Sequence, residues 1–191
     1  TYTTDSQYHS AIAALADGGY VIAWQSNGQD GSGYGVYAQQ YTSSGVPYGS
    51  EFQVNTYTAD EQSNPAIAAL ADGGYVITWQ SNGQDGSGYG VYAQRYASSG
   101  IAYGSEFQVN TYTVDSQYNP AIAALADGGY VITWQGYGQD GSDWGVYAQR
   151  YASSGVAYGQ EFLMMITYLD YVRNPAIAAL ADGGYIITSN N

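Results

Sequence analysis

Cysteine and lysine are both missing from this chain of 191 residues, and histidine occurs once. Without cysteine, the chain can form neither a disulfide framework nor a thiolate metal site. With one imidazole and no thiol, most of the usual general bases and nucleophiles of enzymes are excluded. Paired carboxylates, as in glycosidases, remain a formal route to catalysis. Nearly all of the carboxylates recur at a fixed step along the chain, however, which indicates a structural role. We therefore expect that the protein is not an enzyme.

Positive charge is scarce. Sixteen Asp and Glu side chains face only three arginines, Arg95, Arg150 and Arg173, so the formal net charge is -13 at pH 7. A chain of this charge repels phosphate backbones and anionic membranes, and we expect no nucleic-acid partner. An acidic surface without lysine suits a salty or calcium-rich exterior. The composition therefore favours a secreted or cell-surface location.

Long hydrophobic runs are missing as well. No stretch approaches the roughly 20 apolar residues that a helix needs to span a bilayer, so we expect no membrane insertion. No signal peptide is visible at the start of the sequence, which indicates a mature or internal segment.

The sequence repeats itself every 55 residues. Trp24, Trp79 and Trp134 keep this step, and the copies align without gaps. The second and third copies agree at 43 of 55 positions. A repeat array grows by copies, so the domain boundaries are those of the copies. They lie at 1–55, 56–110, 111–165 and a partial fourth copy at 166–191.

Four strands are predicted in each copy. In the second copy they are 66–71 (AIAALA), 75–80 (YVITWQ), 90–96 (GVYAQRY) and 105–110 (SEFQVN). β-Branched and aromatic residues fill most of these segments, and glycines bound most of them. The Ala-rich first segment is too short for a helix, since Pro65 precedes it and an Asp-Gly-Gly turn follows it. We expect no helix longer than one turn.

Both faces of the predicted strands are partly apolar. Tyr75, Ile77 and Trp79 share one face of their strand, and Val76 lies on the other face. Sheets of this kind are sandwiched between neighbours, which predicts that Trp79 and Trp134 are buried. Repeats of 40–55 residues with four antiparallel strands are typical of propeller blades. The predicted fold is all-β, with tandem four-stranded antiparallel sheets in a β-propeller or a propeller-like stack of blades.

The candidate binding residues are aromatic and lie in a long loop. In a meander, the two short turns of a copy lie at one end of the sheet and the two long loops at the other. One loop position is aromatic in every complete copy, and its residues are Tyr34, Tyr89 and Trp144. Aromatic rings at a surface stack on sugars or on a protein partner, so surface glycans are candidate ligands. Packing of these rings against the adjacent blade is the alternative.

The candidate metal ligands are the aspartates of the GQDG loops, Asp30, Asp85 and Asp140. Calcium takes six to eight oxygen ligands, and a Gly-rich loop offers free carbonyls. The spacing of an EF-hand loop is not met. An Asp-Gly turn, in which the carboxylate accepts nearby backbone N–H groups, is the alternative. No cofactor is required by the sequence, and calcium at these loops is the one candidate.

Two further residues allow local predictions. His9 stands where the other copies carry Asn64, Asn119 and Asn174, so we expect an exposed loop residue without a catalytic role. Arg95 lies on the third strand of its copy, and Glu106 is its expected cross-strand partner.

The run NPAIAALADGGYVITWQSNGQDGSGYGVYAQRYASSGIAYGSEFQVNTYT resembles tandem repeats of very large secreted bacterial proteins, adhesins and hemolysin-type calcium-binding proteins. The segment GVYAQRY, a Ser/Gly turn and GSEFQVNTYT carry this resemblance, which covers essentially the whole chain. It implies an extracellular address, a propeller-like repeat fold and a structural or adhesive role. The calcium-binding nonapeptide of the hemolysin-type proteins is absent, so their calcium sites do not carry over. The segment 162–170 (FLMMITYLD) departs from the other copies and is either a cap or an altered junction.

The predicted function is that of an extracellular structural or adhesive repeat protein, and the alternative is a carbohydrate-binding, lectin-like propeller. The segment AIAALADGGYIIT of the fourth copy is almost the same as the internal copies, so it lacks the polar outer face of a capping repeat. An exposed hydrophobic sheet edge is a template for pairing with another chain. We therefore expect self-association, as a filament or within a longer array.

Overall fold

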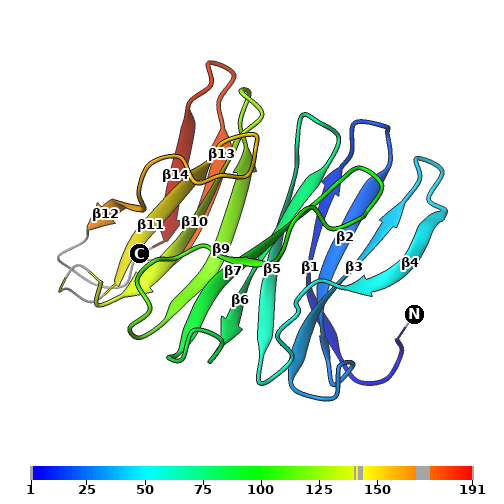
Figure 1. Cartoon of the computed structure of the whole chain (residues 1–191), viewed down its shortest axis with the longest axis horizontal. Helices are drawn as coiled ribbons and strands as arrows, with labels where there is room; N and C mark the ends of the chain where they lie inside the picture. Colours follow the sequence, from blue (N-terminus) through cyan, green and yellow to red (C-terminus); the bar gives the residue numbers. More distant parts are fainter. Residues whose placement is uncertain (1, 140, 142–143, 167–172, 191) are drawn as a thin grey trace.

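The computed structural model describes residues 2–139, 141, 144–166 and 173–190. Within these ranges the chain forms strands and turns and no helix, which confirms the all-β prediction (Figure 1). None of the described segments is a helix long and apolar enough to cross a membrane.

Four antiparallel sheets follow one another along the chain, each with its strands in chain order. The first contains β1 (Gln7–Ala14), β2 (Tyr20–Asn27), β3 (Tyr34–Tyr41) and β4 (Pro47–Gln53). The second contains β5 (Gln62–Ala69), β6 (Tyr75–Asn82), β7 (Tyr89–Tyr96) and β8 (Phe107–Gln108). The third contains β9 (Gln117–Ala124), β10 (Tyr130–Tyr137), β11 (Trp144–Tyr151) and β12 (Phe162–Ile166), and the last pairs β13 (Arg173–Ala179) with β14 (Tyr185–Asn190). We call these sheets blades 1 to 4.

The first strand of each blade begins earlier than predicted. β5 starts at Gln62, and the buried Pro65 lies inside it. The pairing with β6 shifts register between Ser63 and Ala66, and Asn64 within this bulge has a φ of 53°. A bulge is one of the few places where a strand tolerates proline, because the ladder is already interrupted there. The proline therefore marks a bulge within the strand rather than its start.

The outer strand is less regular than predicted. In blade 2 it is reduced to the two residues of β8, whereas β4 has seven residues and β12 has five. The segment 162–170 therefore begins as a strand, and positions 167–170 lie outside the described residues.

Blades stack face to face through two different surfaces (Figure 1). Each blade presents small aliphatic side chains to the next one and aromatic side chains to the previous one. Val21 and Ala23 of blade 1 pack in one buried cluster with Ile77 and Trp79 of blade 2. The same alternation joins blade 2 to blade 3 and blade 3 to blade 4. Trp79 and Trp134 are fully buried in these interfaces, as predicted.

The innermost strands are linked by side-chain amides. The Asn64 amide donates to Asn119 Oδ1 at 2.9 Å, and the Asn119 amide donates to Asn174 Oδ1 at 2.8 Å. The Gln25 side-chain oxygen also accepts the backbone N–H of Asn64 at 3.0 Å. Residues of all four inner strands border one cavity of about 500 Å³, which shows that these strands curve around a common axis. This curvature is that of a propeller.

Two local predictions need correction. His9 is exposed, as predicted, but it lies within β1 and not in a loop, because it takes the bulge position that asparagine fills in later blades. Its Nδ1 lies 2.9 Å from Gln25 Oε1. Arg95 pairs with Asp72, whose carboxylate lies 2.5 Å away, and its guanidinium covers the ring of Tyr103. Glu106 instead accepts hydrogen bonds from the Thr56 backbone N–H and hydroxyl.

Candidate functional site

The long loops of every blade lie at one end of the sheets, as the meander predicts. Because all pairs are antiparallel, the β2–β3 and β4–β5 connections share this end in blade 1. Tyr34, Tyr89 and Trp144 are the first residues of β3, β7 and β11, and each is half-buried.

Two of these aromatic residues form a row across neighbouring blades. Tyr118, on the inner strand of blade 3, lies between them, with ring-centre distances of 5.0 Å to Tyr89 and 5.7 Å to Trp144. Tyr137 continues the row at 5.1 Å from Trp144. We call Tyr89, Tyr118, Trp144 and Tyr137 the aromatic row. In blade 1, Tyr34 lies 6.2 Å from the ring of Tyr8 in the same blade.

A carboxylate lies beside the row. The Tyr89 hydroxyl donates to Glu61 Oε2 at 3.0 Å. Burial and this hydrogen bond to a carboxylate raise the pKa of the Tyr89 hydroxyl. Glu61 of the same repeat therefore holds the neutral Tyr89 hydroxyl in place, while Tyr137 exposes 39% of its surface. The row offers partly exposed ring faces next to an acidic acceptor, which is the chemistry that holds a hydroxyl-rich, weakly apolar ligand.

The aspartates of the GQDG loops hold their own turns together. Asp30 Oδ1 accepts the Ser32 N–H at 3.1 Å, and its Oδ2 accepts the Gln53 amide at 3.1 Å. Asp85 makes the equivalent bonds to Ser87 and Gln108. Asp140 lies outside the described residues. These contacts are those of an Asp-Gly turn.

Calcium binding at these loops stays a prediction. In the described part of the chain, no group of three or more His, Asp or Glu side chains gathers as a metal site would require. Any ion there would depend on backbone carbonyls and water for most of its ligands. Calorimetry with calcium, compared between the chain and its Asp85→Asn variant, would detect such a site. A heat of binding that the substitution leaves unchanged would place calcium elsewhere.

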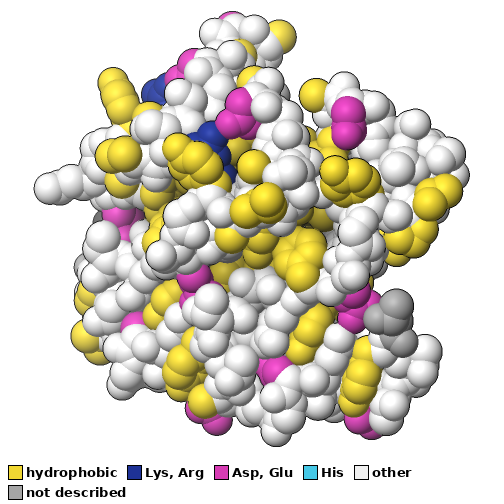
Figure 2. Space-filling view, turned by 45° about the vertical axis from the view of Figure 1, so that its right-hand side comes forward, with side chains coloured by type: hydrophobic (Ala, Val, Ile, Leu, Met, Phe, Trp, Pro, Cys, Tyr) yellow, Lys and Arg dark blue, Asp and Glu magenta, His cyan; other side chains and the backbone are white. Residues whose placement is uncertain are grey.

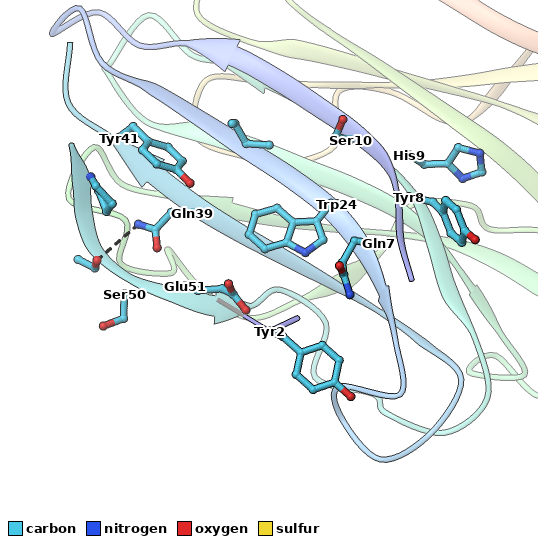
Figure 3. Close-up of a pocket in the computed structure, with 13 residues that line it drawn as sticks. Tyr2, Gln7, Tyr8, His9, Ser10, Trp24, Gln39, Tyr41, Ser50 and Glu51 are labelled. Atoms are coloured by element: carbon cyan, nitrogen blue, oxygen red, sulfur yellow. Dashed lines mark hydrogen bonds between the residues drawn. The ribbon is translucent and has the colours of Figure 1, made fainter. Parts of the chain in front are cut away.

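A cavity of about 870 Å³ lies elsewhere, on the outer face of blade 1. Trp24 of β2 lies at its centre, with Tyr41 and Gln39 of β3 on one side and Gln7 of β1 on the other (Figure 3). Glu51 of β4 also lines it. We call this hollow the Trp24 cleft. Figure 2 turns this end of the molecule forward and shows hydrophobic side chains gathered in it, with acidic groups around them.

Sequence reasoning missed the special position of Trp24. The repeat predicts that it is equivalent to Trp79 and Trp134, yet it is half-buried where they are fully buried. The difference comes from the neighbour and not from the residue, because no described blade covers the outer face of blade 1. Tyr118 could be found more easily from the sequence. It precedes Asn119, close to the long loop that starts its copy, so it is expected at the same end as Tyr89 and Trp144.

Solved structures share this fold. A protein of unknown function from Dyadobacter fermentans aligns with 96% of the chain at a TM-score of 0.71 and 8% identity, and the chain spans 61% of its length. A thermostable family-43 glycoside hydrolase aligns with 96% of the chain at a TM-score of 0.60 and 10% identity, over 65% of its length. An endo-arabinase from Bacteroides thetaiotaomicron aligns with 93% at a TM-score of 0.51 and 14% identity, over 68% of its length. No protein-family model and no curated protein sequence matches the chain. At these identities the likeness shows the fold alone, a propeller-like arrangement of antiparallel sheets.

Proposed function

We propose that this chain is an extracellular structural or adhesive repeat module that acts through its surfaces and not through catalysis. The observation that carries the proposal is the repeated blade interface. Blades 1 and 2 join through Val21, Ala23, Ile77 and Trp79, and blades 2 and 3 join through the equivalent residues one repeat later. A sequence that builds the same interface at every step offers that interface to a further copy as well, until the curvature of the blades closes a ring.

The carboxylates support a role without catalysis. Asp72 accepts the Gly74 N–H at 2.9 Å within its turn and also pairs with Arg95. Glu106 accepts the Gln84 amide at 2.6 Å and ties Thr56, at the start of its repeat, to the outer strand. Each of these groups recurs with the repeat and serves a turn or a strand junction.

Association of the isolated chain tests this proposal. Sedimentation velocity over a range of concentrations should show species larger than one chain of 20.3 kDa. A chain that remains monomeric at every concentration would contradict a role in array formation.

The aromatic row supports a second candidate function, glycan recognition. Tyr118 and Trp144 present neighbouring ring faces from two strands of one blade, and Tyr89 joins them from the previous blade. Some solved propellers with this fold act on carbohydrates, but the proposal for this chain rests on the row itself. Stacking of a sugar ring on aromatic side chains needs no charged ligand, which agrees with the acidic surface.

A glycan array tests this candidate. Binding to a glycan should be reduced about fivefold or more by Trp144→Ala or Tyr118→Ala, since an aromatic contact is worth about 1 kcal/mol. Tyr48→Ala is the matched control, because this exposed tyrosine lies on β4 next to the short turn at the opposite end. If Tyr48→Ala weakened glycan binding as much as Trp144→Ala does, the aromatic row would not be the binding site.

A further inference from the structure

The Trp24 cleft has the residues of a blade interface without the neighbouring blade. In blade 2 the same face carries Tyr75, Ile77 and Trp79, which are all fully buried under blade 1. In blade 1 it carries Tyr20, Ile22 and Trp24, which are only half-buried. Ile12 of β1, on the same face, exposes 65% of its surface, whereas the equivalent Ile67 of blade 2 packs against the interface cluster.

The matching face is open at the other end of the molecule. In blade 1 the aliphatic face is closed by blade 2, and Leu15 and Val21 expose 6% and 0% of their surfaces. In blade 4 the equivalent residues are Leu180 and Ile186, which expose 44% and 52% of their surfaces. The part of the chain that the structure describes thus carries one open aromatic face and one open aliphatic face.

We propose that a second copy of this chain seats the aliphatic face of its blade 4, with Leu180 and Ile186, on the Trp24 cleft of blade 1. The inference rests on the proposed function in one respect, since both require that copies associate. It goes further, because it names the two surfaces that meet, one aromatic and one aliphatic. The contact repeats a packing that the molecule already uses between blades 1 and 2 and between blades 2 and 3.

The curvature of the inner strands sets how two copies meet. His9, Asn64, Asn119 and Asn174, one from each inner strand, border one cavity, so the two open faces lie at the two ends of a single fan (Figure 1). A contact between unlike faces that repeats around an axis closes into a ring. The smallest such ring, which we expect, is a two-fold symmetric dimer in which both open faces of one copy lie on both open faces of the other.

A small ligand is the competing occupant of the cleft. Trp24, Gln39 and Glu51 offer a ring face and polar groups to a sugar (Figure 3). Blade 4 of a second copy is favoured over a sugar as the occupant. The reason is that Trp79 and Trp134, at the same repeat position, are covered by aliphatic side chains of the preceding blade. A glycan in the cleft would leave Leu180 and Ile186 without any role, and the test below separates the two occupants.

Two charge variants and their mixture test the contact. Native mass spectrometry of the unmodified chain should show a species of twice the 20.3 kDa chain mass. Ile22→Asp places a carboxylate in the cleft, and Ile186→Asp places one on the aliphatic face. Each alone should weaken association at least about tenfold, since a charge buried in an apolar contact is costly. Ile101→Asp, at a turn residue that is 70% exposed, is the matched control and should still dimerise.

An equal mixture of the two variants decides between the possible arrangements. Ile22→Asp keeps a normal aliphatic face, and Ile186→Asp keeps a normal cleft, so the mixture should form a heterodimer through one intact contact. Circular dichroism of each variant should match that of the unmodified chain, which separates lost association from lost folding. If the copies associate but the mixture gives no heterodimer, or if Ile186→Asp still dimerises like the control, the named surfaces are wrong and the proposed function stands. If the unmodified chain does not associate at all, both fail.

Discussion

Three tryptophans hold the same place in the repeat, and at the residue scale their surroundings decide what each one does. Trp79 and Trp134 are fully buried between blades, whereas Trp24 is half-buried at the open face of blade 1. The sequence predicts the burial of the first two from the apolar character of both strand faces. It cannot predict the difference for Trp24, because that difference arises from which blade stands beside it.

The cost of removing each tryptophan should follow this burial. Trp79→Ala should lower the free energy of unfolding by about 3–5 kcal/mol, because it leaves a large cavity in a packed interface. Trp24→Ala is the matched control, and at a concentration where the chain is monomeric it should cost less than about 2 kcal/mol. Urea unfolding followed by circular dichroism measures both, and equal costs would contradict the difference in burial.

The buried tyrosines make stability sensitive to high pH. Burial raises the pKa of Tyr130 to about 12, and burial together with the nearby Asp30 and Glu51 raises that of Tyr37 to about 12. An unfolded tyrosine ionises near pH 10. The stability from these neutral side chains is therefore fully present below about pH 10 and is lost as the pH rises toward 12.

A spectrophotometric titration near 295 nm checks this. We expect a first group of tyrosines to ionise near pH 10 and a second group only above it, together with the loss of the folded circular-dichroism signal. The chain unfolded in urea should show one transition near pH 10. A single transition near pH 10 in a chain that stays folded would mean that the tyrosines are not buried.

At the scale of the element, the Asp-Gly-Gly hairpins are built against their neighbouring strand. A Cβ on Gly74 would lie 2.4 Å from the backbone oxygen of Tyr96, and one on Gly129 would lie 2.4 Å from that of Tyr151. The corresponding Gly184 has no such strand beside it among the described residues, and its nearest neighbour is a side-chain oxygen at 3.2 Å.

Alanine at these glycines should therefore have unequal effects. Gly74→Ala should destabilise the chain by about 2 kcal/mol or more, because the backbone of β7 must shift to admit the methyl group. Gly129→Ala should behave in the same way, while Gly184→Ala should be within about 1 kcal/mol of neutral. Thermal unfolding measures all three, and a Gly184→Ala variant as unstable as Gly74→Ala would show that the turn itself, and not the adjacent strand, needs glycine.

The strands were predictable where their residues were regular, and they were not where a bulge or an edge intervened. β6 and β7 begin within one residue of the predicted segments. β5 begins four residues before its predicted start, since the Asn64 bulge accommodates Pro65. β8 keeps two residues of a predicted six, whereas β4, which is also an outer strand, has seven. Part of the aromatic row could be predicted, because Tyr89 and Trp144 hold the same position in the repeat. Their shared contact with Tyr118 could not, because it depends on how neighbouring blades stack.

At the scale of the whole molecule, the chain is a fan of blades whose two end faces are unlike and complementary. One end exposes Ile12 and the Trp24 cleft, and the other exposes Leu180 and Ile186. Burying such faces is the dominant favourable term in association. The surfaces that join blades inside one chain are therefore the surfaces that we expect to join one chain to another.

Electron microscopy of the purified chain at a concentration where it associates tests this claim most directly. We expect particles in which chains meet end to end, with blade 4 of one chain against blade 1 of the next, and rings of two chains as the main class. Particles the size of a single chain, or chains joined through their long-loop ends, would contradict it.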